Sequence, residues 1–72
     1  MPHSEGPPHT TLSDREYQVF QLLAGGTSVS DIAGKLNLSV KTVSTHKARI
    51  LEKLGLGSTA ELVRYALDHK LV

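Results

Sequence analysis

The sequence predicts an all-α domain of four helices that follows a flexible N-terminal tail. Four serines precede apolar residues at helical spacing and can accept from the free backbone N–H groups of a first helical turn. They are Ser13, Ser28, Ser39 and Ser58. Three of the stretches end at residue types that tolerate the left-handed backbone conformation, which is typical of helix ends. These residues are Gly25, Asn37 and Gly55.

Residues 1–11 have the composition of a tail or linker. They hold all three prolines and no apolar residues at a regular spacing. His3 and His9 are two histidines without a third ligand type nearby, so we expect solvated side chains and not a metal site. The domain itself is expected to cover residues 12–72.

The first helix is expected to start after Ser13, with Glu16 completing a capping box, and to end at Gly25-Gly26. Its aromatic residues Tyr17 and Phe20 fall on the apolar side, which favours core packing over stacking on bases.

A short second helix at 29–36 and a third at 40–54 are separated by the turn Asn37-Leu38-Ser39. Ser28, with Asp31 three residues later, marks the start of the second helix. Two helices joined by so tight a turn are typical of a helix-turn-helix.

The third helix has two distinct sides at about 100° per residue. The expected apolar side consists of Val40, Val43, Ile50, Leu51 and Leu54. The opposite side consists of Lys41, Thr45, Ala48, Arg49 and Glu52. At about 1.5 Å per residue the helix is roughly 22 Å long, which suits a major groove about 12 Å wide. We interpret it as a recognition helix.

The net charge of +1 conceals an uneven distribution. Residues 1–34 hold one cation and four anions, whereas residues 35–53 hold five cations and one anion. The positive charge is thus concentrated on the third helix, as expected of a nucleic-acid-binding surface.

The last helix, from Thr59 to about Lys70, is expected to begin with a capping box of Ser58 and Glu61. Its apolar residues cover more of the circumference than packing on one side requires. The excess predicts a homodimer interface. We assign this interface to Ala60, Val63 and Leu67. The alternative is a small helical protein–protein interaction module that docks on a partner through this last helix.

Several classes of function are excluded or disfavoured. Without cysteine the chain has no disulfide, zinc thiolate site or thiol nucleophile. No apolar run approaches the roughly 18 residues of a membrane span, and no signal-peptide pattern is present, so a cytoplasmic protein is expected. The acidic residues stand mainly at helix starts. We therefore expect neither an enzyme nor a cofactor.

Residues 12–72 resemble the LuxR/GerE-type DNA-binding domain, especially the output domains of NarL/FixJ-class response regulators. The matching blocks are Leu12-Ser13-Asp14-Arg15-Glu16, Leu22-Leu23-Ala24-Gly25-Gly26, Asp31-Ile32-Ala33, Lys41-Thr42-Val43-Ser44-Thr45-His46 and Lys53-Leu54-Gly55. The resemblance implies four helices, DNA read by the third and dimer contacts through the fourth. It also implies groove contacts at Ser44, Thr45 and Ala48. Lysine is frequent in the family at the positions of Ser44 and Ala48, so the base preference of relatives does not transfer.

We therefore expect a dimeric transcription regulator that binds double-stranded DNA sequence-specifically. Ser44, Thr45 and Ala48 would lie near base edges, with Ala48 offering only apolar contact, for example to a thymine methyl.

The remaining polar residues of the third helix are expected to position the domain. Lys41, Arg49 and Lys47 would engage phosphates, with a hydroxyl contact from Thr42. His46 is expected to be partly buried and hydrogen-bonded. A receiver domain would need more than a hundred further residues. If the chain is an excised output domain, such control lies upstream of Met1, and if it is a complete protein, regulation is expected from expression level, a partner or dimerisation.

Overall fold

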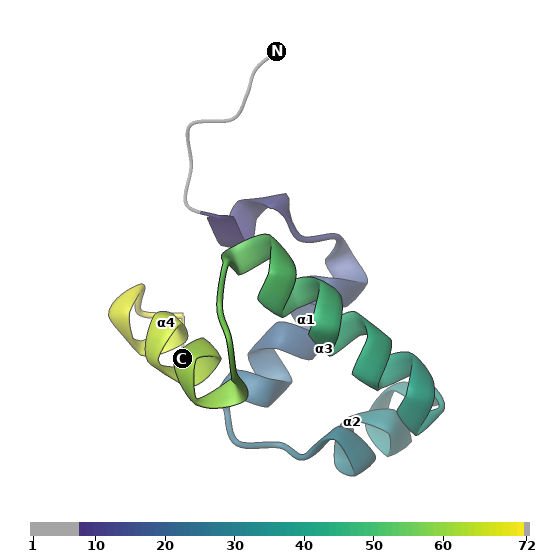
Figure 1. Cartoon of the computed structure of the whole chain (residues 1–72). Coiled ribbons are helices and arrows are strands. Elements are labelled where there is room, and N and C mark those ends of the chain that lie inside the picture. The colour runs from purple at the N-terminus through teal and green to yellow at the C-terminus, as the bar shows by residue number, and fades with distance from the viewer. Residues whose placement is uncertain (1–7, 72) are drawn as a thin grey trace.

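The computed structural model describes residues 8–71, which form four α-helices and one short 3-10 helix (Figure 1). In chain order the elements are η1 (Pro8–Thr11), α1 (Asp14–Ala24), α2 (Val29–Leu36), α3 (Val40–Leu54) and α4 (Thr59–Asp68). The predicted all-α, four-helix domain is confirmed. Residues 1–7, most of the expected tail, and residue 72 lie outside the described part.

Helix α1 is the centre of the domain, because it contacts α2, α3 and α4. In Figure 1, α3 crosses in front of α1, with α4 on one side and α2 at the other end. Each α-helix supplies at least one large side chain that is completely buried. The largest from each helix are Phe20, Ile32, Ile50 and Leu62. The shared core packs against the inner side of α3 and leaves its outer side accessible to solvent.

The four expected serine caps are present. At α1 the capping box is complete: Ser13 Oγ accepts from the Glu16 N–H, and Glu16 Oε1 accepts from the Ser13 N–H. Ser58 Oγ likewise accepts from the Glu61 N–H. However, the Glu61 carboxylate accepts from the Gly57 N–H at 2.9 Å and not from the Ser58 N–H, so the capping box expected there is wrong. Gly57 lies one residue further upstream, and the backbone of Ser58 turns away in an extended conformation.

A left-handed asparagine closes the turn between α2 and α3. Asn37 has φ 59° and ψ 44°, as expected for a residue that tolerates this region. The N–H groups of Asn37 and Leu38 both point to the Ala33 carbonyl oxygen, with 2.9 Å from the Leu38 nitrogen. These bonds satisfy the end of α2 within two residues. The direction of α3 relative to α2 is therefore fixed by backbone bonds as well as by packing.

The segment Pro8–Thr11 is a folded element, which corrects its interpretation as tail. It forms η1, which lies beside α3. The backbone N–H of His9 donates to the Tyr65 hydroxyl oxygen at 3.1 Å, and His9 Nδ1 lies 3.0 Å from the same oxygen. Tyr65 also stacks on His69, with 4.1 Å between ring centroids. The chain before α1 is thus attached to α4.

Helix α4 ends at Asp68, two residues before its expected end. Lys70 has φ 57°, and the Leu71 N–H returns to the Ala66 carbonyl oxygen at 2.8 Å. This left-handed residue stops the helix although it is not a glycine or asparagine. The sequence pattern therefore lacked the usual signal for a helix end.

Candidate nucleic-acid interface

Helix α3 is anchored by a narrow apolar stripe. Val43 and Ile50 are completely buried, and Leu54 is nearly so. Val40, which the helical projection assigned to the same stripe, is instead 50% exposed. Val40 is the first residue of α3, before the helix reaches the first fully buried position. The apolar side of α3 therefore ends at Val43, and Val40 belongs to the accessible surface.

At the start of α3, the hydroxyl groups of Ser39 and Thr42 form a hydrogen bond with each other. Ser39 Oγ accepts from the Thr42 N–H at 3.0 Å and donates its proton to Thr42 Oγ1 at 2.9 Å. Since Thr42 Oγ1 is the acceptor in this bond, its own proton remains available to an outside acceptor. Thr42 is half-buried, so that acceptor has to approach the edge of the helix.

The outer side of α3 is accessible along its length. Five of the seven residues assigned to DNA are exposed: Lys41, Ser44, Thr45, Ala48 and Arg49. The other two, Thr42 and Lys47, are half-buried. Thr45 Oγ1 donates to the Lys41 carbonyl oxygen at 3.1 Å, one turn earlier. The helix brings these seven residues onto one surface and its two edges.

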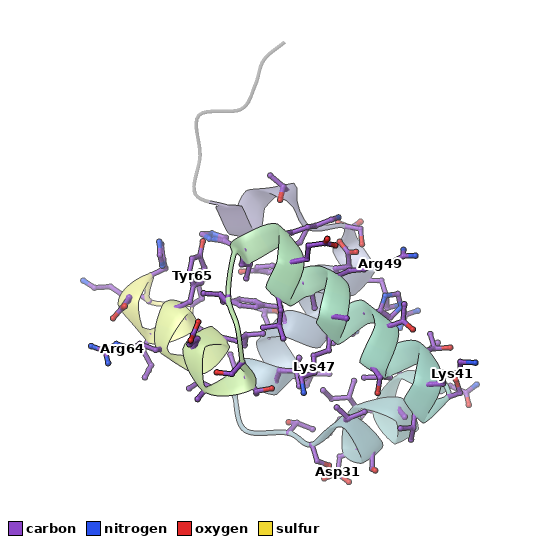
Figure 2. The ribbon with its side chains drawn as sticks, in the orientation of Figure 1. Asp31, Lys41, Lys47, Arg49, Arg64 and Tyr65 are labelled. Carbon is purple, nitrogen blue, oxygen red and sulfur yellow. The ribbon has the colours of Figure 1, made fainter. Side chains whose placement is uncertain are left out.

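The basic residues occupy different edges of this surface. Figure 2 labels Lys41 near the start of α3, and Lys47 and Arg49 on opposite edges of the helix. Within residues 8–71 none of these three side chains forms a salt bridge or a hydrogen bond. Their charges are thus available to an anionic partner such as DNA.

Lys53 does not belong to this free positive charge. Its ammonium lies 2.7 Å from Oε1 of Glu16, a carboxylate with 6% of its side chain exposed. This ammonium, together with the Ser13 N–H, holds the pKa of Glu16 below its usual value against the opposing effect of burial. One of the five cations counted in the basic stretch is therefore neutralised by a residue 37 positions earlier.

His46 departs from expectation. It is half-buried as predicted, but its Nδ1 is buried and has no hydrogen-bond partner within the described residues. The expected hydrogen-bonded histidine is wrong on this point.

Helix α4 exposes part of the predicted dimer surface. Leu67 is 60% exposed and Ala60 is exposed, whereas Val63 is half-buried. Leu62 and Ala66, on the inner side, are completely buried. Figure 2 shows Tyr65 between α4 and η1, and Arg64 projecting away from the domain. The three assigned residues share one side of α4, on which Ala60 and Leu67 are open to solvent and Val63 is partly covered.

Sequence reasoning missed Val40 as a surface residue of α3. The only available signal was its position, because an apolar residue at the first position of a helix precedes the first full turn of core contacts. It also missed His9 and Tyr65, whose contact joins positions 56 residues apart and has no local signature.

Two negative findings apply to residues 8–71. No three histidine, aspartate or glutamate side chains lie close enough together to hold a metal ion. In the same part of the chain, none of the helices combines the length and the apolar character needed to cross a membrane.

The curated proteins that are similar to this chain include the NreC oxygen regulatory proteins of two Staphylococcus species. The NreC oxygen regulatory protein of Staphylococcus epidermidis is 49% identical over 69 residues, which cover 96% of this chain and 32% of NreC. NreC of Staphylococcus aureus is 51% identical over 65 residues, covering 90% of this chain and 30% of that protein. The chain thus spans about a third of the length of these curated relatives.

Solved structures show the same fold. A structure of the Salmonella typhimurium RcsB response regulator, described for its conformational dynamism in DNA interaction, superposes with a TM-score of 0.77. Its sequence is 40% identical, and the match covers 79% of this chain and 28% of that one. A family model described as "Bacterial regulatory proteins, luxR family" matches residues 10–66. The chain therefore belongs to the luxR family of bacterial regulatory proteins.

Proposed function

We propose that this chain binds double-stranded DNA sequence-specifically and regulates transcription, with α3 in the major groove. Membership in the luxR family supports DNA-binding regulation, and it assigns the chain to regulators and not to enzymes. The single observation that carries the proposal is the outer side of α3. There a helix that follows a tight turn presents unpaired cations and small polar groups.

The residues of α3 divide into two roles. Ser44, Thr45 and Ala48 are exposed on the middle of the outer side, where base edges would lie. The cations Lys41, Arg49 and Lys47 would contact phosphates, which position the helix without reading sequence. Thr42 would add a hydroxyl contact to a phosphate oxygen, because its proton is not used within the domain.

Salt titration tests the proposal. Binding to random duplex DNA should weaken steeply as salt is raised. The Lys41→Ala and Arg49→Ala variants should each lower the salt slope by about one and weaken binding to all sequences alike. Arg15→Ala, which removes an exposed cation from α1, is the matched control. If either α3 variant changed base preference while keeping nonspecific affinity, the phosphate assignment would be wrong. Absence of binding at low salt would refute the proposed function.

We further propose a homodimer through Ala60, Val63 and Leu67 of α4. Leu67, which is 60% exposed, lies on the same side of α4 as Ala60 and Val63, and this contiguous apolar strip supports the proposal because a second copy of the domain could pack on it. A dimer would engage two half-sites related by two-fold symmetry. Leu67→Lys should bind one half-site normally and lose cooperative binding to a pair of half-sites. Asp68→Asn on the same helix is the control, and cooperativity retained by Leu67→Lys would contradict the interface.

The surrounding protein is also a proposal. The matched RcsB structures belong to a response regulator, and this chain covers less than a third of them. We propose that the chain serves as the DNA-binding output domain of such a two-component regulator, with its receiver domain outside this sequence. A regulator of this kind would act in the bacterial cytoplasm, where its DNA lies.

A further inference from the structure

We infer that the base-reading surface of α3 recognises thymine methyl groups, with Val40 as a further specificity-determining residue, so that preferred half-sites are rich in A·T pairs. This inference rests on the proposed function, because it assumes that α3 enters the major groove. It goes further by naming the feature of the DNA that α3 reads and a residue outside the assigned set.

Val40 lies in one row with two of the residues assigned to base edges. Residues four apart on a helix are neighbours on its surface. Val40, Ser44 and Ala48 therefore form a continuous row along α3, and all three are exposed. Val40 is 50% exposed at the first position of the helix. The N-terminal residues of a recognition helix are the ones that reach base edges. About half of this residue is open to solvent, so its isopropyl group can contact a partner outside the described domain.

The hydroxyl groups in the middle of this surface offer few hydrogen-bond donors. Thr45 Oγ1 gives its proton to the Lys41 carbonyl oxygen at 3.1 Å. Its outward contribution is therefore a methyl group and an acceptor oxygen, but no donor. Ser44 forms no hydrogen bond with any described residue, and its hydroxyl can donate or accept. Only one hydroxyl donor thus remains on the central part of this surface.

The surface lacks the side-chain types that most often read guanine and adenine. Guanine is most often read by a bidentate arginine or lysine, and adenine by asparagine or glutamine. None of these types occurs at positions 40, 44, 45 or 48. Methyl groups do occur, on Val40, Thr45 and Ala48. In the major groove the apolar feature that such groups can meet is the C5-methyl of thymine. The apolar groups on this surface are therefore of the kind that contacts the C5-methyl group of thymine.

The size of the effect follows from apolar burial. Removing one methyl-sized contact costs about 0.8 kcal/mol, which is about a fourfold loss of affinity. Two or three such contacts in each half-site would give a preference that selection can detect. Lys41 and Arg49 would still provide most of the sequence-independent affinity, so the reading of methyl groups can be separated from binding itself.

Deoxyuridine provides the test, because it pairs like thymidine and lacks only the C5-methyl group. The 72-residue chain is first used to select sites from a random duplex pool. Each thymine of the enriched site is then replaced in turn by deoxyuridine, and affinity is measured for the native chain and for Val40→Ala. Circular dichroism verifies that the variant remains folded, as expected for a change at a half-exposed side chain.

The expected result is a loss of about fourfold for deoxyuridine at two or more positions. Val40→Ala should make one of these positions insensitive and leave the others unchanged, so those positions serve as internal controls. The inference is overturned if deoxyuridine sites bind as tightly as thymine sites, or if Val40→Ala changes no sensitivity. It is also overturned if the enriched sites are rich in G·C. In these cases the chain still binds DNA, and the proposed function stands; a chain that binds no DNA overturns both.

Discussion

The ammonium of Lys53, in the last turn of α3, donates to Oε1 of Glu16 in the first turn of α1 at 2.7 Å. The same oxygen accepts from the Ser13 N–H at 3.0 Å. One carboxylate therefore caps α1 and holds the end of α3. With 6% of its side chain exposed, it has little contact with water to replace either bond.

Removing either partner of this pair should destabilise the domain, and the two losses should differ. Lys53→Met leaves a buried carboxylate without its cation, and we expect a loss of about 2 kcal/mol in the free energy of unfolding. Glu16→Gln keeps an acceptor for the Ser13 N–H and removes the charge, so about 1 kcal/mol is expected. Urea unfolding followed by circular dichroism measures both. Unchanged stability in Lys53→Met would show that the buried carboxylate does not depend on Lys53.

The pair should also make stability depend on pH. The pKa of Glu16 is lowered in the folded state, first by the hydrogen bond from Lys53, then by the Ser13 N–H. Its stabilising effect is present above the usual value of 4.5 and is lost as the pH falls through the lowered pKa. The stability difference between the native chain and Glu16→Gln should therefore shrink below about pH 4.5. Urea unfolding across that range tests this, and a difference independent of pH would contradict it.

Tyr65→Phe should loosen η1 without disturbing the core. The substitution removes the hydroxyl that meets both the His9 N–H and the His9 Nδ1, and it keeps the ring that contacts Phe20 and His69. We expect a loss of about 1 kcal/mol and faster amide exchange at His9. Tyr17→Phe is the control, because no described residue forms a hydrogen bond with the Tyr17 hydroxyl. Unchanged exchange at His9 in Tyr65→Phe would show that η1 is held by other contacts.

Glu52→Gln should strengthen DNA binding. Glu52 is the sole acidic residue of α3, and it is exposed. On the helix it lies three and four residues beyond Arg49 and Ala48, so its carboxylate would approach the phosphates and repel them. The neutral amide has nearly the same shape, and a severalfold gain in affinity for random duplex DNA at low salt is expected. Glu61→Gln is not a suitable control, because the Glu61 carboxylate caps α4. The control is Asp31→Asn on α2, which changes the net charge by the same amount. An equal gain in both variants would show that the position of the charge does not matter.

The sequence predicted what local chemistry determines. The serine caps, the left-handed Asn37 and Gly55, and the bounds of α1, α2 and α3 all depend on residues within one or two turns of each other, so a single sequence contains the signal. The luxR-type resemblance added the order of the helices, whereas the DNA-reading role that it implies for α3 stays a prediction.

Contacts between distant positions were not predictable in this way. The Glu16–Lys53 pair spans 37 residues and the His9–Tyr65 contact spans 56. Nothing in the spacing of such residues marks a contact, which depends on how the helices pack. The exposure of Val40 was missed for a related reason. A helical projection gives the direction of a side chain, but it does not show where along the axis the neighbouring helix begins.

Buried and exposed positions alternate along α3, and this arrangement has an evolutionary consequence. Val43, Ile50 and Leu54 hold the helix in the core, while the exposed residues between them make few contacts with the rest of the domain. Substitutions at such exposed positions usually change stability by no more than about 0.5 kcal/mol. After gene duplication, the proposed recognition surface can therefore diverge while the fold is retained. Under the proposed function, regulators with separate operators can arise from this scaffold by a handful of changes on a single helix.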